Sequence, residues 1–245
     1  MTAPRRSASL RSAAPLRLAC IDAEAPPLFS KSPDGVTRDG YEPDLAALVA
    51  AALGRTVQWV FTPWAEFVPS LQAHEVDAVW CGQGITEARR RHVDFTRPYA
   101  IFNESVLVRR GAPVATPADL RGLRVAAIEG STNMSLAETF DGALAVPFGG
   151  ETDDVFGDML AALRTGEVDA VVDDDVVFVP LADDPDFDLA FTVPTGNRWG
   201  VAVAKDRPDL LSELNEALTA IIEDGRLKEA WQDRMPALPY PFPAP

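Results

Sequence analysis

The sequence predicts an α/β protein with two lobes of similar plan, each a mostly parallel sheet flanked by helices. Apolar strand-like runs alternate with helix-like segments along the chain, and this alternation is typical of βαβ units. A five-residue motif occurs twice, as Glu75-Val76-Asp77-Ala78-Val79 and as Glu167-Val168-Asp169-Ala170-Val171, each time after a helix-like segment. Because 245 residues can form two lobes of about 100 residues each, the repeat indicates two lobes built alike.

The composition argues against several classes of partner. The 22 basic and 37 acidic residues give a formal net charge of −15, which disfavours a nucleic acid or an anionic membrane as partner. No apolar run approaches the roughly 20 residues that a membrane-spanning helix needs. The 2 cysteines and 2 histidines form no CxxC motif and no Cys/His cluster, so a transition-metal site is not expected. We therefore expect neither a metal nor a cofactor.

The two cysteines, Cys20 and Cys81, each lie in an apolar strand-like run. Cysteines in such surroundings behave as small hydrophobic residues, so we interpret both as buried free thiols. A disulfide between them is the alternative, and it stays open at this stage.

The two ends of the sequence are expected to lie outside the folded lobes. Residues 1–15 are basic and rich in Ser and Ala, and we expect them to be disordered. They lack the apolar segment of about 7 to 15 residues that a secretory signal contains. Either the protein is cytoplasmic, or its export signal lies upstream of this sequence. Residues 241–245 form a Pro-rich tail that we expect to be extended.

The first part of the chain contains three strand-like runs joined by helices. The segment from Pro43 to Gly54 begins with proline, carries apolar residues at helical spacing and ends with glycine, which predicts a helix packed on a sheet. A turn at Ser32-Pro33-Asp34-Gly35 predicts a loop or small hairpin over 29–40. We expect strands over 16–22, 57–61 and 76–81, and a second helix over 64–73.

The same alternation begins again after residue 100. We expect strands over 104–110, 125–128 and 168–172, a short helix opening near 117, and helices over 134–140 and 155–164. A last strand over 200–204 precedes a long helix over 208–224, whose leucines and isoleucines recur on one face. Gly225 breaks that helix before a final one over 226–235.

A glycine-rich turn after the strand over 76–81 is the strongest candidate for a binding site. Gly82 and Gly84 let the chain turn sharply at the end of the strand. Thr86 is a good helix N-cap, which places Arg89 in the first turn of a short helix. Open α/β sheets bind ligands at such strand ends, and a guanidinium there matches a carboxylate. The alternative is that Arg89 and the two arginines after it form a solvated basic face.

With both lobes in view, the chain resembles the bacterial extracellular solute-binding proteins of family 3, the receptors of polar amino-acid ABC importers. The resemblance covers nearly all of residues 16–235 and depends on the order and spacing of several motifs together. These motifs are Asp22 followed by Pro26-Pro27, Gly40 to Leu45, Trp64 to Leu71, Gly84 to Arg89, Val93 to Tyr99, Gly130 to Thr132, Val168 to Asp174 and the strand at Gly200.

The resemblance implies a two-lobed periplasmic-binding-protein fold of type II, with a ligand cleft between lobes that are joined by two crossovers. Lobe one would comprise residues 16–99 plus 199–240, and lobe two residues 103–195. The crossovers would lie at 99–103 and 197–199, and the lobes would close around a ligand by hinge motion there.

The resemblance also implies ligand-binding roles for individual residues. Arg89 matches the arginine that holds the ligand α-carboxylate, and Thr132 matches the residue at the start of a helix that faces the same carboxylate. Asp174 matches the acid that pairs with the ligand α-ammonium, since a zwitterion in a closed cleft needs both charges paired. Thr132 could instead be a simple N-cap, and we interpret Asp173 and Asp175 as solvated or lid-edge acids.

Other matched positions would form the walls of the pocket. Trp64 matches a wall residue, although a core tryptophan is the alternative. Asp22 matches an acid that can face the ligand side chain, where it would favour a basic or hydrogen-bond-donating group. Two departures from the family pattern concern Ala25, which replaces a covering aromatic residue, and Gly84, which replaces a Ser or Thr. Alanine at position 25 enlarges the pocket or leaves Trp64 to cover more of the ligand. Glycine at position 84 removes one hydrogen bond to the ligand, although backbone contacts from Gly82 and Gly84 could remain.

We expect a receptor without catalytic activity that captures an amino acid or a close derivative and delivers it to an ABC importer permease. The resemblance implies a monomer that works outside the cytoplasm, in the periplasm or at the cell surface. One alternative is an enzyme on the same fold, similar to cyclohexadienyl or arogenate dehydratases, for which Glu24 or Asp175 would have to serve as the acid. Another is an amino-acid-sensing binding protein that is not exported.

Overall fold

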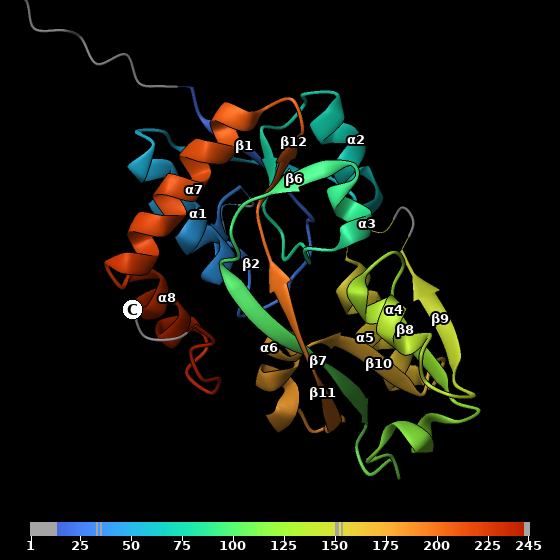
Figure 1. The fold of residues 1–245 in the computed structure, drawn as a ribbon. Coiled ribbons are helices and arrows are strands. Elements are labelled where there is room, and N and C mark those ends of the chain that lie inside the picture. Colours follow the sequence, from blue (N-terminus) through green and yellow to red (C-terminus); the bar gives the residue numbers. More distant parts are fainter. Residues whose placement is uncertain (1–13, 33, 35, 150–151, 153, 243–245) are drawn as a thin grey trace, which may run out of the picture.

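Two five-stranded sheets organise the structure (Figure 1). The computed structural model describes residues 14–32, 34, 36–149, 152 and 154–242. In the first sheet the strand order is β4-β1-β5-β12-β6, with β1 parallel to β4 and β5 and with β12 antiparallel to its two neighbours. Its strands are β1 Leu16–Cys20, β4 Val57–Phe61, β5 Ala78–Val79, β6 Val93–Phe95 and β12 Ala202–Ala204.

The second sheet uses one contiguous part of the chain, in the order β11-β7-β10-β8-β9. β8 pairs in parallel with β9 and β10, and β7 runs antiparallel to β10 and β11. Its strands are β7 Ala100–Arg109, β8 Arg124–Ile128, β9 Leu144–Phe148, β10 Ala170–Asp174 and β11 Phe187–Trp199. Each sheet combines parallel strands with an antiparallel addition, and the predicted α/β class is confirmed.

Helices cover both sheets. α1, α7 and α8 pack against one another beside the first sheet, at the left of Figure 1. The longer helices are α1 Tyr41–Ala52, α5 Val155–Thr165, α7 Pro208–Glu223 and α8 Arg226–Arg234. The shorter ones are α2 Phe67–Gln72, α3 Glu87–Arg90, α4 Thr132–Ala137 and α6 Asp175–Phe178, with 3-10 turns η1 Trp64–Glu66, η2 Pro117–Leu120 and η3 Val179–Asp183. A small hairpin, β2 Ser30–Lys31 and β3 Arg38–Asp39, completes the fold.

Two long strands connect the sheets. The start of β7 and the end of β11 lie side by side, with Ala100 opposite Trp199 and Phe102 opposite Asn197. These are the segments that the sequence predicts as crossovers, and they form a paired ribbon instead of two separate loops. Because the ribbon is hydrogen-bonded, the two segments must bend together. The lobe boundaries proposed from the resemblance stay a prediction.

Buried aromatic residues pack around this ribbon. The rings of Phe102 and Trp199 lie 4.8 Å apart, and Tyr99 lies next to them. The Tyr99 hydroxyl donates to Glu42 at 2.8 Å, and the Tyr41 hydroxyl donates to the Tyr99 carbonyl at 2.7 Å. Glu42 is fully buried, and burial raises its pKa to about 8. A protonated carboxyl group is therefore part of the packing beside the ribbon.

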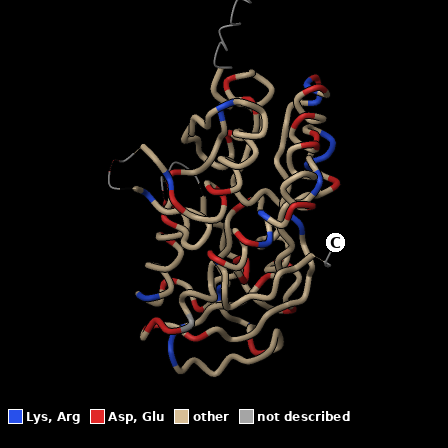
Figure 2. Tube along the Cα trace, turned by 90° about the vertical axis from the view of Figure 1, so that its left-hand side faces the viewer, with Lys and Arg blue, Asp and Glu red and all other residues tan. Residues whose placement is uncertain are grey.

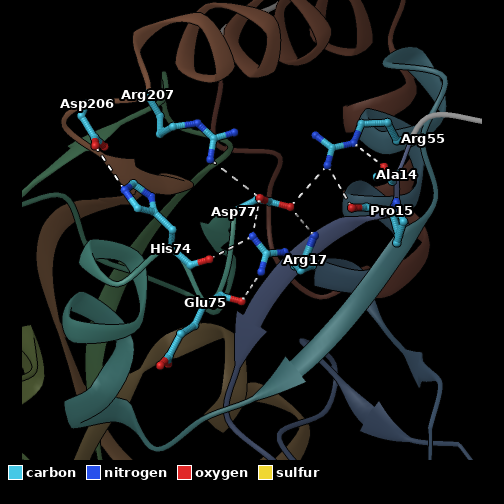
Figure 3. A network of polar contacts seen from close by, with 9 residues as sticks. All are labelled: Ala14, Pro15, Arg17, Arg55, His74, Glu75, Asp77, Asp206 and Arg207. Carbon is cyan, nitrogen blue, oxygen red and sulfur yellow. Dashed lines mark hydrogen bonds and ion pairs between the residues drawn. The ribbon is translucent and has the colours of Figure 1, made fainter.

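The repeated five-residue motif has the same structural role in both sheets. Asp77 accepts a hydrogen bond from the Arg17 amide at 2.9 Å, and Asp169 accepts one from the Arg124 amide at 2.9 Å. Each aspartate also accepts from the guanidinium of the same arginine at 3.0 Å. In both cases the aspartate fixes the start of the neighbouring strand. Figure 3 shows the first of these sites, where Arg17, Arg55 and Arg207 surround Asp77.

The structure decides the alternative left open for the two cysteines and corrects the expected disorder at two residues. Both cysteines are free and buried, with the Cys20 and Cys81 sulfur atoms 3.2 Å apart. Ala14 and Pro15, which we expected to be disordered, are held by Arg55, which donates to their carbonyl groups at 2.8 and 2.9 Å. The rest of that segment, 1–13, and residues 243–245 of the Pro-rich tail lie outside the described residues.

Charged residues lie along the trace of both sheets and their helices (Figure 2). Acidic residues are in excess, in keeping with the net charge of −15. Within the described ranges, no helix combines the length and the apolar character that crossing a membrane requires.

Candidate functional site

Two adjoining cavities lie between the sheets and contain the predicted site residues. The smaller cavity, of about 70 Å³, is lined by residues that include Gly82, Gly84, Arg89, Thr132 and Asp174. The larger cavity, of about 460 Å³, has Asp22 in its lining. Both cavities are lined by Ile21, Trp64, Arg89 and Ile128, which therefore stand at the boundary between them. The structure thus brings all the predicted site residues into one region.

Arg89 projects from α3 into the junction of the two cavities. Thr86 is the N-cap of α3, as the sequence predicts, and its Oγ1 accepts a hydrogen bond from the Arg89 amide at 3.1 Å. The guanidinium donates to the carbonyl groups of Gly84 at 2.8 Å and Gly130 at 3.0 Å. It lies 5.3 Å from the centre of the Trp64 ring, within range of a cation–π attraction. Arg89 is partly buried, whereas the two arginines after it are exposed, so a purely solvated basic face does not describe it.

Gly82 and Gly84 are required for different physical reasons. Gly82 has a φ of +55°, in the left-handed region that glycine adopts without steric cost. A Cβ atom at Gly84 would lie 3.1 Å from the Thr132 methyl group and 3.3 Å from Arg89 Nη1. The side chains of Thr132 and Arg89 therefore take up the space that a Ser or Thr would need at this position.

The second sheet contributes the start of α4. Ser131 is the N-cap of this helix, since its hydroxyl accepts a hydrogen bond from the Met134 amide at 3.0 Å. Thr132 is the first helical residue, so the N-cap alternative considered for it is wrong. Amide groups in the first turn of a helix have no partner within the helix, and both Thr132 and Asn133 line the smaller cavity. The start of α4 therefore contacts the same cavity as Arg89.

Three buried carboxyl groups meet at the end of β10. Asp173 and Asp174 are 7% and 8% exposed, and Glu104 of the neighbouring β7 is fully buried. Asp174 Oδ1 has no hydrogen-bond partner among the described residues. Burial and the neighbouring acids raise the pKa of Asp174 well above its usual value. Burial also raises the pKa of Asp173, to about 7.

Asp173 is not a solvated or lid-edge acid, and our interpretation of it was wrong. It lines the smaller cavity beside Asp174. Its Oδ1 accepts hydrogen bonds from Asn133 Nδ2 at 3.1 Å and from the Asp174 amide at 2.8 Å. Asp173 and Asp174 are the last two residues of β10, and both line the cavity although side chains alternate along a strand. Asp175 lies outside the lining and accepts from Asn103 Nδ2 at 3.1 Å.

Trp64 and Asp22 belong to the wall of the larger cavity. Trp64 is partly buried, opens η1 and contacts both cavities, so it is a wall residue and not a core tryptophan. Asp22 lies just beyond β1 and forms ion pairs with Lys31, at 3.4 Å, and with Arg38. The Asp22 carboxylate therefore already has partners within the chain.

Sequence reasoning missed part of the cover of the smaller cavity. Leu28 and Phe29 line it together with Ala25, and the Ala25 amide donates to the Phe29 carbonyl at 3.0 Å. Phe29 is 3% exposed, so an aromatic ring is present close to the position where the covering aromatic of the family is replaced by alanine. The turn signal of Pro26-Pro27 indicates that the chain folds back here, and it could have suggested this placement.

The site has the charges that a zwitterion needs. A guanidinium, the first residues of α4 and a pair of buried acids all line the smaller cavity. An ammonium group would supply the hydrogen bonds that Asp174 Oδ1 lacks and would compensate the buried negative charge. No group of His, Cys, Asp and Glu side chains suited to a metal ion is found in the part of the chain that the structure describes.

Known relatives bind amino acids. The ABC transporter glutamine-binding protein GlnH of Bacillus subtilis is 28% identical over 82% of this chain and 74% of its own length. The L-arginine-binding protein of Pseudomonas aeruginosa is 30% identical over 88% of this chain and 85% of its own. The structure of an ancestral arginine-binding protein bound to arginine superposes with a TM-score of 0.82 at 28% identity, covering 92% of this chain and 100% of that chain.

The match to a family extends over both sheets. The sequence profile of the bacterial extracellular solute-binding proteins, family 3, matches residues 18–233. This range contains every residue of the candidate site, and it confirms the resemblance inferred from the motifs. The chain belongs to the bacterial extracellular solute-binding proteins of family 3.

Proposed function

We propose that this protein is a receptor that captures an α-amino acid between its two lobes and delivers it to an ABC importer. One observation carries the proposal: Arg89 and Asp174, which come from different sheets, line the same small cavity. Each charge of a zwitterion then meets an opposite charge, so neither is buried without compensation. The relatives support this class of ligand, because their names specify glutamine and arginine.

The α-carboxylate of the ligand would lie against Arg89 and the start of α4. The guanidinium has five N–H donors, and its bonds to Gly84 and Gly130 leave others for the ligand. A planar fork of donors suits a carboxylate, and the free amides at the start of α4 approach from the second sheet. The carboxylate would thus be bound by groups from both lobes.

The α-ammonium would lie against Asp174, with Asp173 beside it. An ammonium carries three donors, and Asp174 Oδ1 is an acceptor without a partner among the described residues. Its positive charge also offsets the repulsion between the two buried acids and lowers their pKa values. Binding energy would therefore come from relieving an unfavourable charge arrangement as well as from new hydrogen bonds.

Bridging of the two sheets by one ligand would favour a closed arrangement of the lobes. We propose that residues 16–99 with 199–240 move as lobe one and residues 103–195 as lobe two. The paired ends of β7 and β11 are then the hinge, since they are the segments that connect the two sheets. The family description as extracellular supports a receptor that works outside the cytoplasm over a sensor that is not exported.

The site gives no support to the dehydratase alternative. Neither Glu24 nor Asp175 is among the described residues that line the two cavities. Glu24 instead accepts a hydrogen bond from the Lys31 amide, and Asp175 accepts one from Asn103. The relatives named above are binding proteins and not enzymes.

Isothermal titration calorimetry with the common amino acids tests the proposal. Arg89→Ala should weaken binding of any α-amino acid by at least about 100-fold, because breaking a buried charge pair costs about 3–5 kcal/mol. Arg91→Ala is the matched control, since Arg91 has the same charge and is exposed two residues away. Unchanged affinity in Arg89→Ala, or equal losses in both variants, would contradict the proposal.

A further inference from the structure

A two-stranded hairpin brings two cationic side chains to Asp22, the acid in the wall of the larger cavity. Lys31 of β2 and Arg38 of β3 are opposite each other in the hairpin, so their side chains share one face. Lys31 Nζ lies 3.4 Å from Asp22 Oδ2, and Arg38 Nη2 contacts Asp22 Oδ1. Both oxygens of this carboxylate therefore have a cationic partner within the chain.

The Arg38 side chain is as deeply buried as that of a core residue. Its side chain is only 1% exposed, and its guanidinium stacks over the Phe61 ring at 3.9 Å from the ring centre. Its Nη1 also donates to the Thr37 carbonyl at 3.1 Å. Phe61 and Asp22 both line the larger cavity, and the buried Arg38 lies behind the wall that they form. Because Arg38 is buried in contact with Asp22, it compensates the charge of that carboxylate.

We infer that Lys31 and Arg38 determine the side-chain specificity of this receptor, and that they select α-amino acids with uncharged side chains over those with cationic ones. Because both oxygens of the Asp22 carboxylate are already paired with cations of the chain, this acid no longer attracts a guanidinium or ammonium group of the ligand. An uncharged side chain needs no such partner and can use Thr62, Gln83 and the Trp64 ring. The inference rests on the proposed function, since a ligand held at Arg89 directs its side chain into the larger cavity.

Glu129 is the other acid in the described lining of the larger cavity, on the side of the second sheet. It is exposed to solvent, so its attraction for a cationic side chain is screened by water. An exposed pair of this kind contributes less than about fivefold to affinity. We therefore expect Glu129 to give only a weak preference for a cationic side chain.

The test compares L-arginine with L-citrulline, which has the same length and shape but an uncharged ureido group in place of the guanidinium. Calorimetry on the full chain should find that citrulline binds at least as tightly as arginine. Lys31→Met, a change at an exposed residue, should shift the affinity ratio toward arginine by about two- to fivefold. Adding Arg38→Met should increase the shift to about tenfold or more, because the more buried cation is then removed.

Lys205→Met is the matched control for these variants. Lys205 is also an exposed lysine paired with an aspartate, Asp94, at 3.1 Å, but neither residue is part of the described lining of either cavity. Lys205→Met removes the same charge and should leave the ratio of citrulline affinity to arginine affinity unchanged.

The outcomes separate this inference from the proposed function. The inference is overturned if Lys31→Met and the double variant both leave the ratio of citrulline affinity to arginine affinity unchanged, whatever this ratio is in the native chain. If Arg89→Ala still abolishes binding in that case, the proposed function stands and the specificity lies elsewhere. An arginine preference that Glu129→Gln removes also overturns the inference and assigns the selection to Glu129. Failure of every α-amino acid to bind overturns both.

Discussion

Binding of an α-amino acid should release protons and should therefore strengthen as the pH rises from 5.5 to 7. Asp173 and Asp174 are buried side by side next to Glu104, and burial raises the pKa of Asp173 to about 7 and that of Asp174 well above its usual value. At pH 6 the pair therefore holds a proton in the free protein. A ligand ammonium stabilises the ionised form of the pair, so this proton leaves on binding.

The sign of the effect follows from proton linkage. The complex binds fewer protons than the free protein, so the affinity increases with pH until the acids are ionised in both. Release of one proton for each ligand gives about a tenfold rise in affinity per pH unit. With a pKa of about 7 for Asp173, half of the free protein has already lost this proton at pH 7, so the expected rise between pH 5.5 and 7 is about 15-fold.

Calorimetry at pH 6 in two buffers with different ionisation enthalpies measures the released protons directly. The observed binding enthalpy should differ between the buffers in proportion to the number of protons released. Asp173→Asn should reduce this number, whereas Asp175→Asn should not, because Asp175 lies outside the described lining of the cavity. Equal enthalpies in both buffers, or an affinity that falls between pH 5.5 and 7, would refute the reasoning.

Three further predictions concern stability and packing. Burial raises the pKa of Glu42 from 4.5 to about 8, so the folded state binds more protons than the unfolded state. Stability should therefore fall as the pH rises from about 5 to 8. In Glu42→Gln the melting temperature should depend less on pH over this range. The two guanidinium groups at Asp169 lower its pKa to about 2. Asp169→Ala should therefore lower the free energy of unfolding, measured in urea at pH 7, by about 1–2 kcal/mol. The native chain should lose this stabilisation as the pH falls from about 4 to 2. Gly84→Ala places a Cβ atom 3.1 Å from the Thr132 methyl group, and it should weaken ligand binding about tenfold in calorimetry.

Each of these predictions has a result that would contradict it. Glu229→Gln changes an exposed glutamate and should leave the pH profile of melting as in the native chain, so a similar flattening in both variants would count against Glu42. Asp141 pairs with Arg121 on the surface, with both side chains largely exposed, so Asp141→Ala should cost less than Asp169→Ala. For Gly84→Ala, native affinity would show that the neighbouring side chains yield without cost.

Elements with strong local signals could be predicted from the sequence. The strand over 57–61 has the same bounds in the structure, and Thr86 caps its helix as expected. β9 and β11 were not predicted, because Pro147 interrupts the first pattern and Pro194 and Gly196 interrupt the second. β11 forms a strand because it pairs along β7, a segment far away in the sequence, and such pairing leaves no local pattern.

The residues of the candidate site also differ in how well the local sequence predicts their positions. Arg89 follows a local turn and cap, so its place at a strand end could be predicted from neighbouring residues. The setting of Asp173 depends on its contact with Asn133, 40 positions away, and the pairing of Asp22 depends on a hairpin residue 16 positions away. Neither contact has a signal in the residues next to it, so only the folded chain reveals that one acid is available and the other is compensated.

The order in which the strands leave the ribosome differs between the two sheets. The second sheet uses only the chain from Ala100 to Trp199, whereas the first needs β12, at Ala202–Ala204, between β5 and β6. Until β12 is synthesised, β5 remains an edge strand, although its ladder of two residues offers little surface for wrong pairing. The turn that carries Arg89 is fixed late as well, because the Ile85 amide donates to the Arg198 carbonyl at 2.8 Å. A nascent chain can therefore place Asp173 and Asp174 before the turn that carries Arg89, because that turn waits for the synthesis of Arg198.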